Sequence, residues 1–386
     1  MILQNWWYTT LLGTDGVLQP PLRGHVQTDV AVVGAGMAGL SAAMRLMASG
    51  RRVTVLERNV CGGSSTGKSA GFLTPDSELE LSQLMRRFGT EGARELWAVP
   101  VRGIELITGY VRRHDMQCDL VKQDSLFVGN SGSGRRDVQQ EFEARRSLGF
   151  PQTLYPRGRV AAVLGTMNYT GGVRYPGTYG INALLYAQGI KRVLLANGVR
   201  VHESTEVRHI EGHTLHTHLG SVTADQIIVC ADKLKPSFTP YARNVFHAQT
   251  FLSISEPLEE RAVRRLFPEE PMQCWDTDLV YTYWRLTGDR RLLVGGGSAL
   301  STSALHAVTT PVGDREGHPA LQGEVPLPQG PRVHPVLARP HRHDARPVPH
   351  GSPGRAGALG ALRARLRRAA VGGVLRGFRR PARAGH

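Results

Sequence analysis

The chain has 386 residues, few cysteines and no long apolar segment. Its four cysteines are scattered and form no Cys-x-x-Cys pair, which argues against both a zinc site and a disulfide scaffold. The sequence contains no run of about 18 apolar residues, so it predicts no membrane helix. The first eight residues lack the basic and apolar regions of a signal peptide. We therefore expect a soluble, cytoplasmic protein with no bound metal and no membrane partner.

Lysine is absent from residues 312–386, which hold 14 arginines and four acidic residues. This segment carries +10 of the formal +15 charge, and residues 1–311 carry only +5. A strongly basic surface would favour a nucleic-acid partner. Because the charge is concentrated in one segment, we expect no nucleic-acid partner, and the rest of the chain has the charge of an ordinary soluble enzyme.

Residues 29–57 follow the pattern strand, tight turn, helix, strand. The runs 30–33 and 53–56 are short, apolar and rich in valine, as buried parallel strands are. Between them, Gly34, Gly36 and Gly39 form Gly-x-Gly-x-x-Gly at the start of a helix that ends near residue 50. The combined pattern predicts a dinucleotide-binding unit.

Each position of this unit has a physical task. Gly36 has no Cβ to obstruct a pyrophosphate, Gly39 lets the helix pack on the strand, and the helix N-terminus attracts phosphate. Glu57, at the end of the second strand, is placed to accept hydrogen bonds from ribose hydroxyls. Its negative charge disfavours a 2′-phosphate and therefore NADP.

The next loop, residues 62–69, reads Gly-Gly-Ser-Ser-Thr-Gly-Lys-Ser and satisfies the phosphate-loop pattern of nucleoside triphosphatases. A true phosphate loop leads directly into a long helix, whereas here glycine and proline follow at Gly71 and Pro75. Two other interpretations remain: a solvated Ser/Gly loop, or a second phosphate-contacting loop of a flavin protein. We favour the last, with Ser64, Ser65 and Lys68 near the pyrophosphate.

These segments resemble the FAD-dependent amine and amino-acid oxidoreductases of the D-amino-acid oxidase/glycine oxidase type. The chain looks similar in particular to the branch of gamma-glutamylputrescine oxidoreductase-like proteins. The resemblance rests on Trp7 and Pro20–Gly24 in the N-terminal arm, on the unit 29–57 and on the loop 62–71. Lys68 stands where the family usually has arginine, which preserves the charge.

The resemblance implies an α/β fold with a Rossmann-like FAD-binding domain and an inserted antiparallel-sheet substrate domain. It also implies an enzyme that oxidises the C–N bond of a primary or secondary amine or amino acid. In such enzymes hydride passes to flavin N5 and the imine is hydrolysed, so the partner is a small amine or amino acid. The expected FAD-binding residues are Gly34, Gly36, Met37, Ala38, Gly39, Glu57, Arg58, Ser64, Ser65, Lys68, Val207 and Ala231.

The segment 275–297 alternates as a hairpin with its turn at Gly288–Asp289. It is similar to a family segment in which a strand of the substrate sheet returns to the flavin. By that resemblance Tyr281, Tyr283 and Arg285 are the substrate-pocket candidates, with Arg285 positioned to pair with a substrate carboxylate. The alternative is an exposed cross-strand arginine together with two tyrosines that only pack.

The middle of the chain predicts a helix over 179–197, closed by Gly198, followed by strands at 199–203 and 224–232. Asp232 and Lys233 depart from the family pattern beside the flavin. The histidines at 202–216 are interpreted as surface strand residues, because no carboxylate or cysteine joins them at metal-ligand spacing.

The expected domains are an N-terminal arm, lying extended on the surface, a discontinuous FAD-binding domain, a substrate domain and a tail. The arm spans 1–27. The FAD-binding domain spans 28–75, 155–240 and 293–311, and the substrate domain spans 76–154 and 241–292. The tail spans 312–386.

The tail, 312–386, is rich in arginine, proline and glycine and contains no isoleucine, asparagine, tyrosine or tryptophan. A disordered basic tail, a nucleic-acid arm and an out-of-frame translation of a GC-rich gene compete to explain it. When codons are written for this segment and translated one base later, the resulting amino-acid sequence resembles the family's C-terminal flavin motif. We therefore interpret the tail as out of frame and disordered. The chain would then bind FAD weakly or fold poorly.

Two other functions remain open besides the amine oxidoreductase. One is an inactive, frameshifted relic of such an enzyme, and the other is an NAD-dependent dehydrogenase on the same fold. The second is disfavoured because a single dinucleotide fingerprint is accompanied by the flavin-type loop at 62–71.

Overall fold

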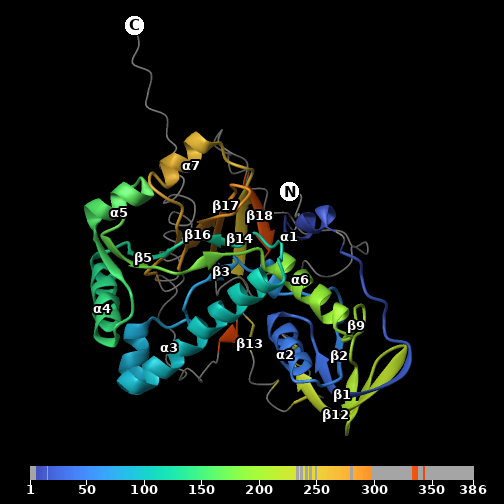
Figure 1. Ribbon diagram of the computed structural model, residues 1–386. Coiled ribbons are helices and arrows are strands. Elements are labelled where there is room, and N and C mark those ends of the chain that lie inside the picture. Colours follow the sequence, from blue (N-terminus) through green and yellow to red (C-terminus); the bar gives the residue numbers. More distant parts are fainter. Residues whose placement is uncertain are drawn as a thin grey trace, which may run out of the picture.

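The computed structural model describes residues 6–14, 16–231, 250–278 and 281–297, with short stretches at 234, 238–239, 242, 246–247, 333–337 and 342–343. Within these residues two large β-sheets, each accompanied by helices, form the body of the protein (Figure 1). No helix in this described part of the chain is long and apolar enough to span a membrane.

One sheet has six strands and carries the glycine-rich turn. Its strands are β1 (Gly24–Val33), β2 (Val53–Leu56), β9 (Arg200–His202), β10 (His209–Glu211), β11 (Thr214–His216) and β12 (Gly220–Val229). They lie in the order β10-β11-β12-β1-β2-β9. The four strands from β12 to β9 are parallel, whereas β10 and β11 form an antiparallel hairpin at the edge.

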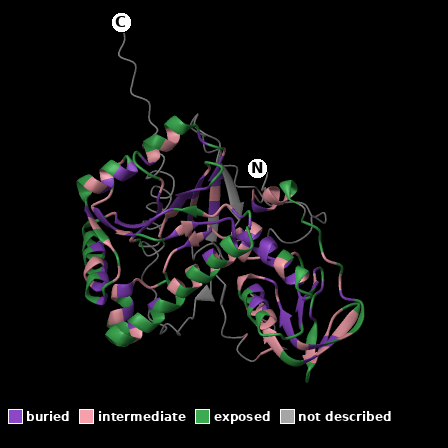
Figure 2. Ribbon diagram, viewed as in Figure 1, coloured by how far each residue is buried: buried purple, intermediate pink, exposed green. Residues whose placement is uncertain are grey.

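Two helices, α2 (Met37–Ala48) and α6 (Ala183–Ala196), contact each other and cover one face of this sheet (Figure 1). Apolar side chains of β1 and β2 pack there against those of the helices. The run 30–33 is buried on both faces (Figure 2), because a second apolar cluster around Leu22 and Val222 covers the opposite side. This burial explains the continuous apolar character of the strand.

The second sheet has eight strands. They are β5 (Ser125–Gly129), β6 (Thr153–Pro156), β7 (Gly171–Tyr175), β14 (Thr250–Ser255), β15 (Gln273–Asp276), β16 (Tyr283–Leu286), β17 (Leu292–Gly297) and β18 (Val333–Leu337). The order is β18-β14-β17-β16-β15-β5-β7-β6, and every neighbouring pair except β15–β5 is antiparallel. Three helices accompany it: α4 (Gly132–Leu148), α5 (Arg157–Leu164) and α7 (Glu260–Leu266).

Smaller elements complete the described fold. The strands β3 (Phe72–Leu73), β8 (Tyr179–Gly180) and β4 (Val121–Lys122) form a three-stranded sheet, and β13 (Phe246–His247) pairs with β19 (Arg342–His343). The long helix α3 (Leu81–Arg113) contains Pro100 and is kinked at Gly89, whose φ of +72° breaks the helical geometry. The N-terminal segment forms α1 (Trp6–Thr9) and the 3-10 helix η1 (Thr10–Gly13), and a second 3-10 helix, η2, spans Thr66–Lys68.

The predicted α/β fold, with a parallel nucleotide-type sheet and an antiparallel sheet, is confirmed. The second strand of the fingerprint unit and the hairpin in 275–297 also form as predicted, the latter as β16 and β17. The loop at 62–69 leads into η2 and β3 and not into a long helix, so the triphosphatase interpretation fails.

Three sequence-based expectations need correction. The arm lies extended on the surface only in part: residues 16–21 are non-helical and mostly exposed, whereas α1 and η1 are helical and Trp7 is 2% exposed. The helix predicted over 179–197 begins only at Ala183, since Tyr179–Gly180 pairs with β3 and Asn182 caps the helix. Finally, β6, β7 and β17, assigned wholly or partly to the FAD-binding domain, belong to the eight-stranded sheet. Their non-local strand pairing is invisible in a local sequence pattern.

Candidate functional site

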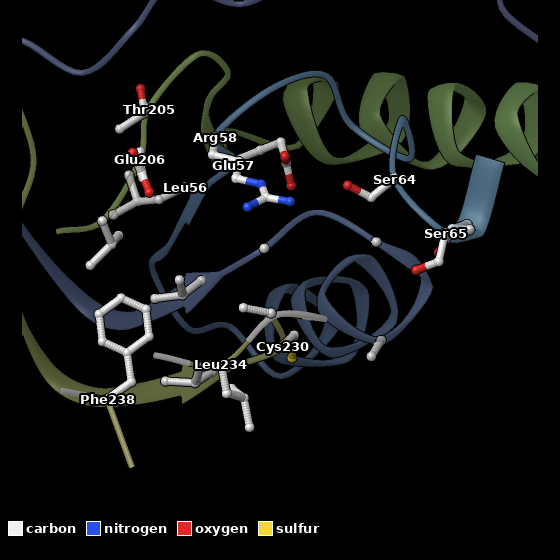
Figure 3. A pocket seen from close by; sticks show the side chains of 18 of the residues that line it. Leu56, Glu57, Arg58, Ser64, Ser65, Thr205, Glu206, Cys230, Leu234 and Phe238 are labelled. Atoms are coloured by element: carbon white, nitrogen blue, oxygen red, sulfur yellow. The ribbon is translucent and has the colours of Figure 1, made fainter. Parts of the chain in front are cut away.

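A cavity of about 520 Å³ lies at the carboxyl ends of β1, β2 and β12. Figure 3 shows it as an elongated space with Thr205, Glu206 and Phe238 toward one end and Ser64 and Ser65 toward the other. The crevice at the carboxyl ends of parallel strands is where open α/β sheets bind ligands. Its length and polar ends suit a dinucleotide.

The turn below this cavity requires glycine. Gly34 has a φ of +98°, and a Cβ there would lie 2.9 Å from the carbonyl oxygen of Cys230 on the neighbouring strand. A Cβ on Gly39 would lie 1.9 Å from the carbonyl oxygen of Gly34. Helix α2 can therefore approach the strand as closely as it does only with glycine at position 39.

The N-terminus of α2 opens toward the cavity at Gly36, its N-cap residue. The amide of Met37 donates a hydrogen bond to Oγ1 of Thr66, at 3.0 Å, so the second loop is tied to the first turn of the helix. Ser64 and Ser65, just before Thr66, line the same cavity. Amides of a helix N-terminus and nearby hydroxyls together form a polar cradle for phosphate groups.

Glu57 follows β2 and is 6% exposed. Its Oε2 accepts a hydrogen bond from the amide of Ala35 and its Oε1 accepts one from the amide of Asn59. Each carboxylate oxygen can accept more than one hydrogen bond, so Glu57 holds the glycine turn and still presents acceptors to the cavity that it lines. These donor and acceptor positions fit the ribose and pyrophosphate of a dinucleotide.

Ten of the twelve residues predicted to bind the cofactor line this cavity, namely Gly34, Gly36, Met37, Ala38, Glu57, Arg58, Ser64, Ser65, Val207 and Ala231. Gly39 lies behind the turn, where it has a packing role. Lys68 lines a neighbouring cavity and not this one. Sequence patterns did not assign Thr66, Cys230, Leu234 or Phe238 to this site. Thr66 and Cys230 are next in sequence to the predicted Ser65 and Ala231, whereas Leu234 and Phe238 belong to no predicted motif.

The second cavity, of about 200 Å³, adjoins the first, since Ser65 lines both. Its walls come from the loop 65–78, from Leu252 of β14 and from Trp275, Tyr281 and Tyr283. Tyr281 and Tyr283, both predicted pocket residues, line it, with their ring centroids 5.7 Å apart. Burial, followed by the nearby Glu78 carboxylate, raises the pKa of both phenols, so both remain protonated at neutral pH.

Acidic side chains also surround this second cavity, a feature that the sequence did not indicate. Asp76 and Glu78 line it directly. Glu80 lies next to it, where its carboxylate accepts hydrogen bonds from the indole of Trp275 at 2.8 Å and the hydroxyl of Tyr175 at 3.2 Å. Burial and the neighbouring Glu141 raise the pKa of Glu80 above its usual range. A protonated Glu80 adds no negative charge at neutral pH, so the acidic character of the second cavity rests on Asp76 and Glu78, which line it.

Arg285 does not line either cavity. It is 1% exposed, and its guanidinium donates hydrogen bonds to the carbonyl oxygens of Ala70 (2.6 Å), Ile181 (2.8 Å) and Leu286 (3.1 Å). Burial lowers its pKa to about 10, a value at which the group is still charged at neutral pH. The guanidinium is thus engaged with the backbone. We therefore correct the sequence-based expectation that Arg285 binds a substrate carboxylate.

The N-terminal segment supports the second loop from outside. The indole of Trp7 donates a hydrogen bond to the carbonyl oxygen of Ser69, and the hydroxyl of Tyr8 donates one to that of Gly63. A Cβ on Gly63 would lie 2.3 Å from that hydroxyl, so the packing is close. The loop between the two cavities is therefore held by residues more than 50 positions away in the sequence.

The histidines of β10 and β11 are more closely grouped than the sequence predicted. Pairing of the two strands stacks the rings of His209 and His216, with centroids 4.3 Å apart, and brings Glu211 beside them. Ligand atoms of the three residues lie within 4.8 Å of one another, so a carboxylate does join the histidines, contrary to the expectation from spacing. None of the three lines either cavity.

Comparison with known proteins gives a consistent picture. The family model described as FAD dependent oxidoreductase (DAO) matches residues 29–356. Gamma-glutamylputrescine oxidoreductase of Escherichia coli strain K12 is 29% identical over 286 residues, which is 72% of this chain and 66% of that protein. A probable oxidoreductase of Haemophilus influenzae, OrdL, is 26% identical over 290 residues, covering 72% and 67%. The chain thus spans about two thirds of the length of these curated relatives.

Solved structures show the same fold. Glycine oxidase from Geobacillus kaustophilus superposes with a TM-score of 0.59 at 18% identity, covering 86% of this chain and 88% of that one. The interpretation of residues 312–386 as out of frame and disordered falls outside the described residues, apart from β18 and β19. The family match nevertheless continues to residue 356 and does not end where the composition changes.

Proposed function

The chain belongs to the family of FAD-dependent oxidoreductases that act on amines or amino acids, and from this premise we propose that it oxidises the C–N bond of a primary or secondary amine. The observation that carries the proposal is the junction of the two cavities at Ser65. One cavity has the size and polar groups for a dinucleotide, and the other is small and lined by aromatic rings. An enzyme that brings a small substrate to FAD needs this arrangement.

FAD, when bound, would supply the electron-accepting chemistry: it would take up the hydride removed from the carbon next to the amine nitrogen, and water would hydrolyse the imine to a carbonyl compound and an amine or ammonia. The chain supplies binding and orientation. Glu57 offers acceptors to the ribose, and the N-terminus of α2 with Ser64 and Ser65 offers donors to the pyrophosphate. The rings of Phe72, Tyr281 and Tyr283 exclude water from part of the smaller cavity.

The two tyrosines are proposed to orient the amine, not to remove a proton from it. Their raised pKa values keep them protonated, so neither acts as a strong base at neutral pH, and the oxygen of each hydroxyl can accept a hydrogen bond from an N–H of the amine. The hydroxyl of Tyr281 already donates to Oε2 of Glu78 at 3.2 Å, which fixes the ring at the cavity wall.

If the proposal holds, purified protein contains about one FAD per chain, contrary to the weak binding expected from an out-of-frame tail. It then forms peroxide or reduces an artificial electron acceptor when mixed with members of an amine panel. Flavin content is measured by absorbance after denaturation, and NAD is offered separately as a control. Absence of flavin would favour the inactive relic. Bound NAD, with amine-dependent formation of NADH, would instead favour the dehydrogenase.

A further inference from the structure

The smaller cavity presents two carboxylates on one short stretch of chain. Asp76 and Glu78 both line it. Glu78 has a φ of +63°, an uncommon backbone conformation for a residue other than glycine, and its amide donates a 2.8 Å hydrogen bond to Oδ1 of Asp76. Strained backbone that is held by its own hydrogen bonds often occurs at ligand sites.

The cavity offers little positive charge to balance this pair. Among the described residues that line it, Lys68 is the only cation. Its Nζ lies over the ring of Tyr8, 6.0 Å from the centroid. The nearest buried guanidinium, Arg285, is engaged with three carbonyl groups. A ligand group that fits this end of the cavity is therefore a cation and not a carboxylate.

The reacting nitrogen of the substrate is a poor match for this position. Oxidation needs the neutral amine, whose lone pair assists departure of the hydride, and nearby carboxylates favour the protonated form of an amine. The carboxylates also lie apart from the junction with the dinucleotide cavity. Ser65 borders both cavities, whereas Asp76 and Glu78 line only the smaller one. The carboxylates thus suit a charged group at the far end of the substrate.

We propose that the preferred substrate is an α,ω-diamine or short polyamine whose distal ammonium group is bound by Asp76 and Glu78. This inference rests on the proposed amine oxidation and adds the substrate class. The two carboxylates accept charge-assisted hydrogen bonds from the distal ammonium. The aromatic rings of Phe72, Trp275 and Tyr283 pack along the methylene chain.

The test compares a straight-chain diamine of four carbons with pentylamine, which has the same length and lacks the second charge. We expect wild-type protein loaded with FAD to oxidise the diamine with a kcat/KM at least about tenfold higher. Asp76→Asn and Glu78→Gln should each lower that value by about 10- to 100-fold and bring the ratio of the kcat/KM values for diamine and pentylamine toward one. Both replacements keep an oxygen that accepts the observed hydrogen bonds.

A binding measurement separates this inference from the proposed function. Calorimetric titration under anaerobic conditions, with the flavin reduced, measures affinity without turnover. The diamine should bind more tightly than pentylamine to wild-type protein, and that difference should shrink in the two variants even if no amine is oxidised. Glu95→Gln, which changes an exposed carboxylate on α3, is the matched control and should alter neither amine.

Equal binding of the two amines, or a diamine preference that survives both substitutions, would overturn the proposal. So would preference for an amino acid over both amines, since that would place a carboxylate in the acidic end of the cavity. Loss of turnover with the binding difference retained would contradict only the proposed oxidation.

The pH dependence adds a separate check. Burial, followed by the neighbouring Glu78, raises the pKa of Asp76 to about 6, and the more distant Arg145 opposes this shift. Glu78, Glu80 and Arg145 are the charged groups that act on this carboxyl, with Lys68 on the same cavity wall. Asp76 binds a cation when ionised, and the ammonium groups of the four-carbon diamine stay charged near pH 6, so affinity for this diamine should fall as pH drops below about 6. The affinity of the Asp76→Asn variant should not show this fall with pH.

Discussion

Replacement of Gly36 by valine is expected to weaken FAD binding by at least about a hundredfold, or ~2.7 kcal/mol. The backbone at Gly36 is extended (φ −80°, ψ −173°), a conformation that valine adopts readily. A Cβ there would meet only Oγ1 of Thr66, at 3.2 Å, so the FAD-free fold should tolerate it. The added methyl groups would instead occupy the space where the pyrophosphate approaches the N-terminus of α2.

Flavin titration and chemical unfolding of the FAD-free protein, measured on the same variant, separate these two effects. The affinity should fall while the free energy of unfolding changes by less than about 1 kcal/mol. Gly103→Ala on α3 is a suitable control, because a Cβ there meets nothing within 4 Å and should leave affinity unchanged. Wild-type affinity in Gly36→Val would show that the dinucleotide does not cross this turn.

Arg285→Met is expected to destabilise the protein by about 2–4 kcal/mol. The substitution keeps a long apolar side chain but removes the donors that the carbonyl groups of Ala70 and Ile181 now use. A Cβ on Gly71 or on Gly180 would lie within 3 Å of the guanidinium, so backbone from two distant segments is packed around it. Loss of the group should loosen the loop between the cavities and reduce FAD retention as well.

The control substitution is Arg264→Met on α7. The side chain of Arg264 is 74% exposed and forms an ion pair with Glu260. Surface ion pairs contribute little, so its free energy of unfolding should change by less than about 0.5 kcal/mol. If Arg285→Met were as stable as wild type and lost activity only with carboxylate-bearing substrates, Arg285 would be a substrate contact after all.

The nucleotide half of the site could be predicted from the sequence because its determinants are local. The glycines at 34, 36 and 39, the two valine-rich strands and Glu57 fall within 29 consecutive residues, 29–57, and each has one physical reason for its position. The resemblance to a known family predicted that residues of the 275–297 hairpin form the substrate pocket. Tyr281 and Tyr283 then proved to line the smaller cavity.

The substrate half could not be predicted in the same way, because its determinants are long-range. Arg285 looks like a pocket residue on an alternating strand, yet it is buried by carbonyl groups from residues 70 and 181. Asp76 and Glu78 look like turn residues before a helix and become cavity walls only when β14 and the 275–283 region pack opposite them. The grouping of Glu211 with two histidines likewise depends on the register of a short hairpin.

The most direct test of the account is anaerobic mixing of the FAD-loaded protein with a four-carbon diamine while the flavin absorbance is followed. This measurement does not depend on which acceptor reoxidises the flavin. The account predicts that the oxidised-flavin absorbance disappears in a diamine-dependent manner and that the product is the corresponding amino aldehyde. Flavin that stays oxidised with every amine and amino acid tested, in protein that retains one FAD per chain, would contradict it.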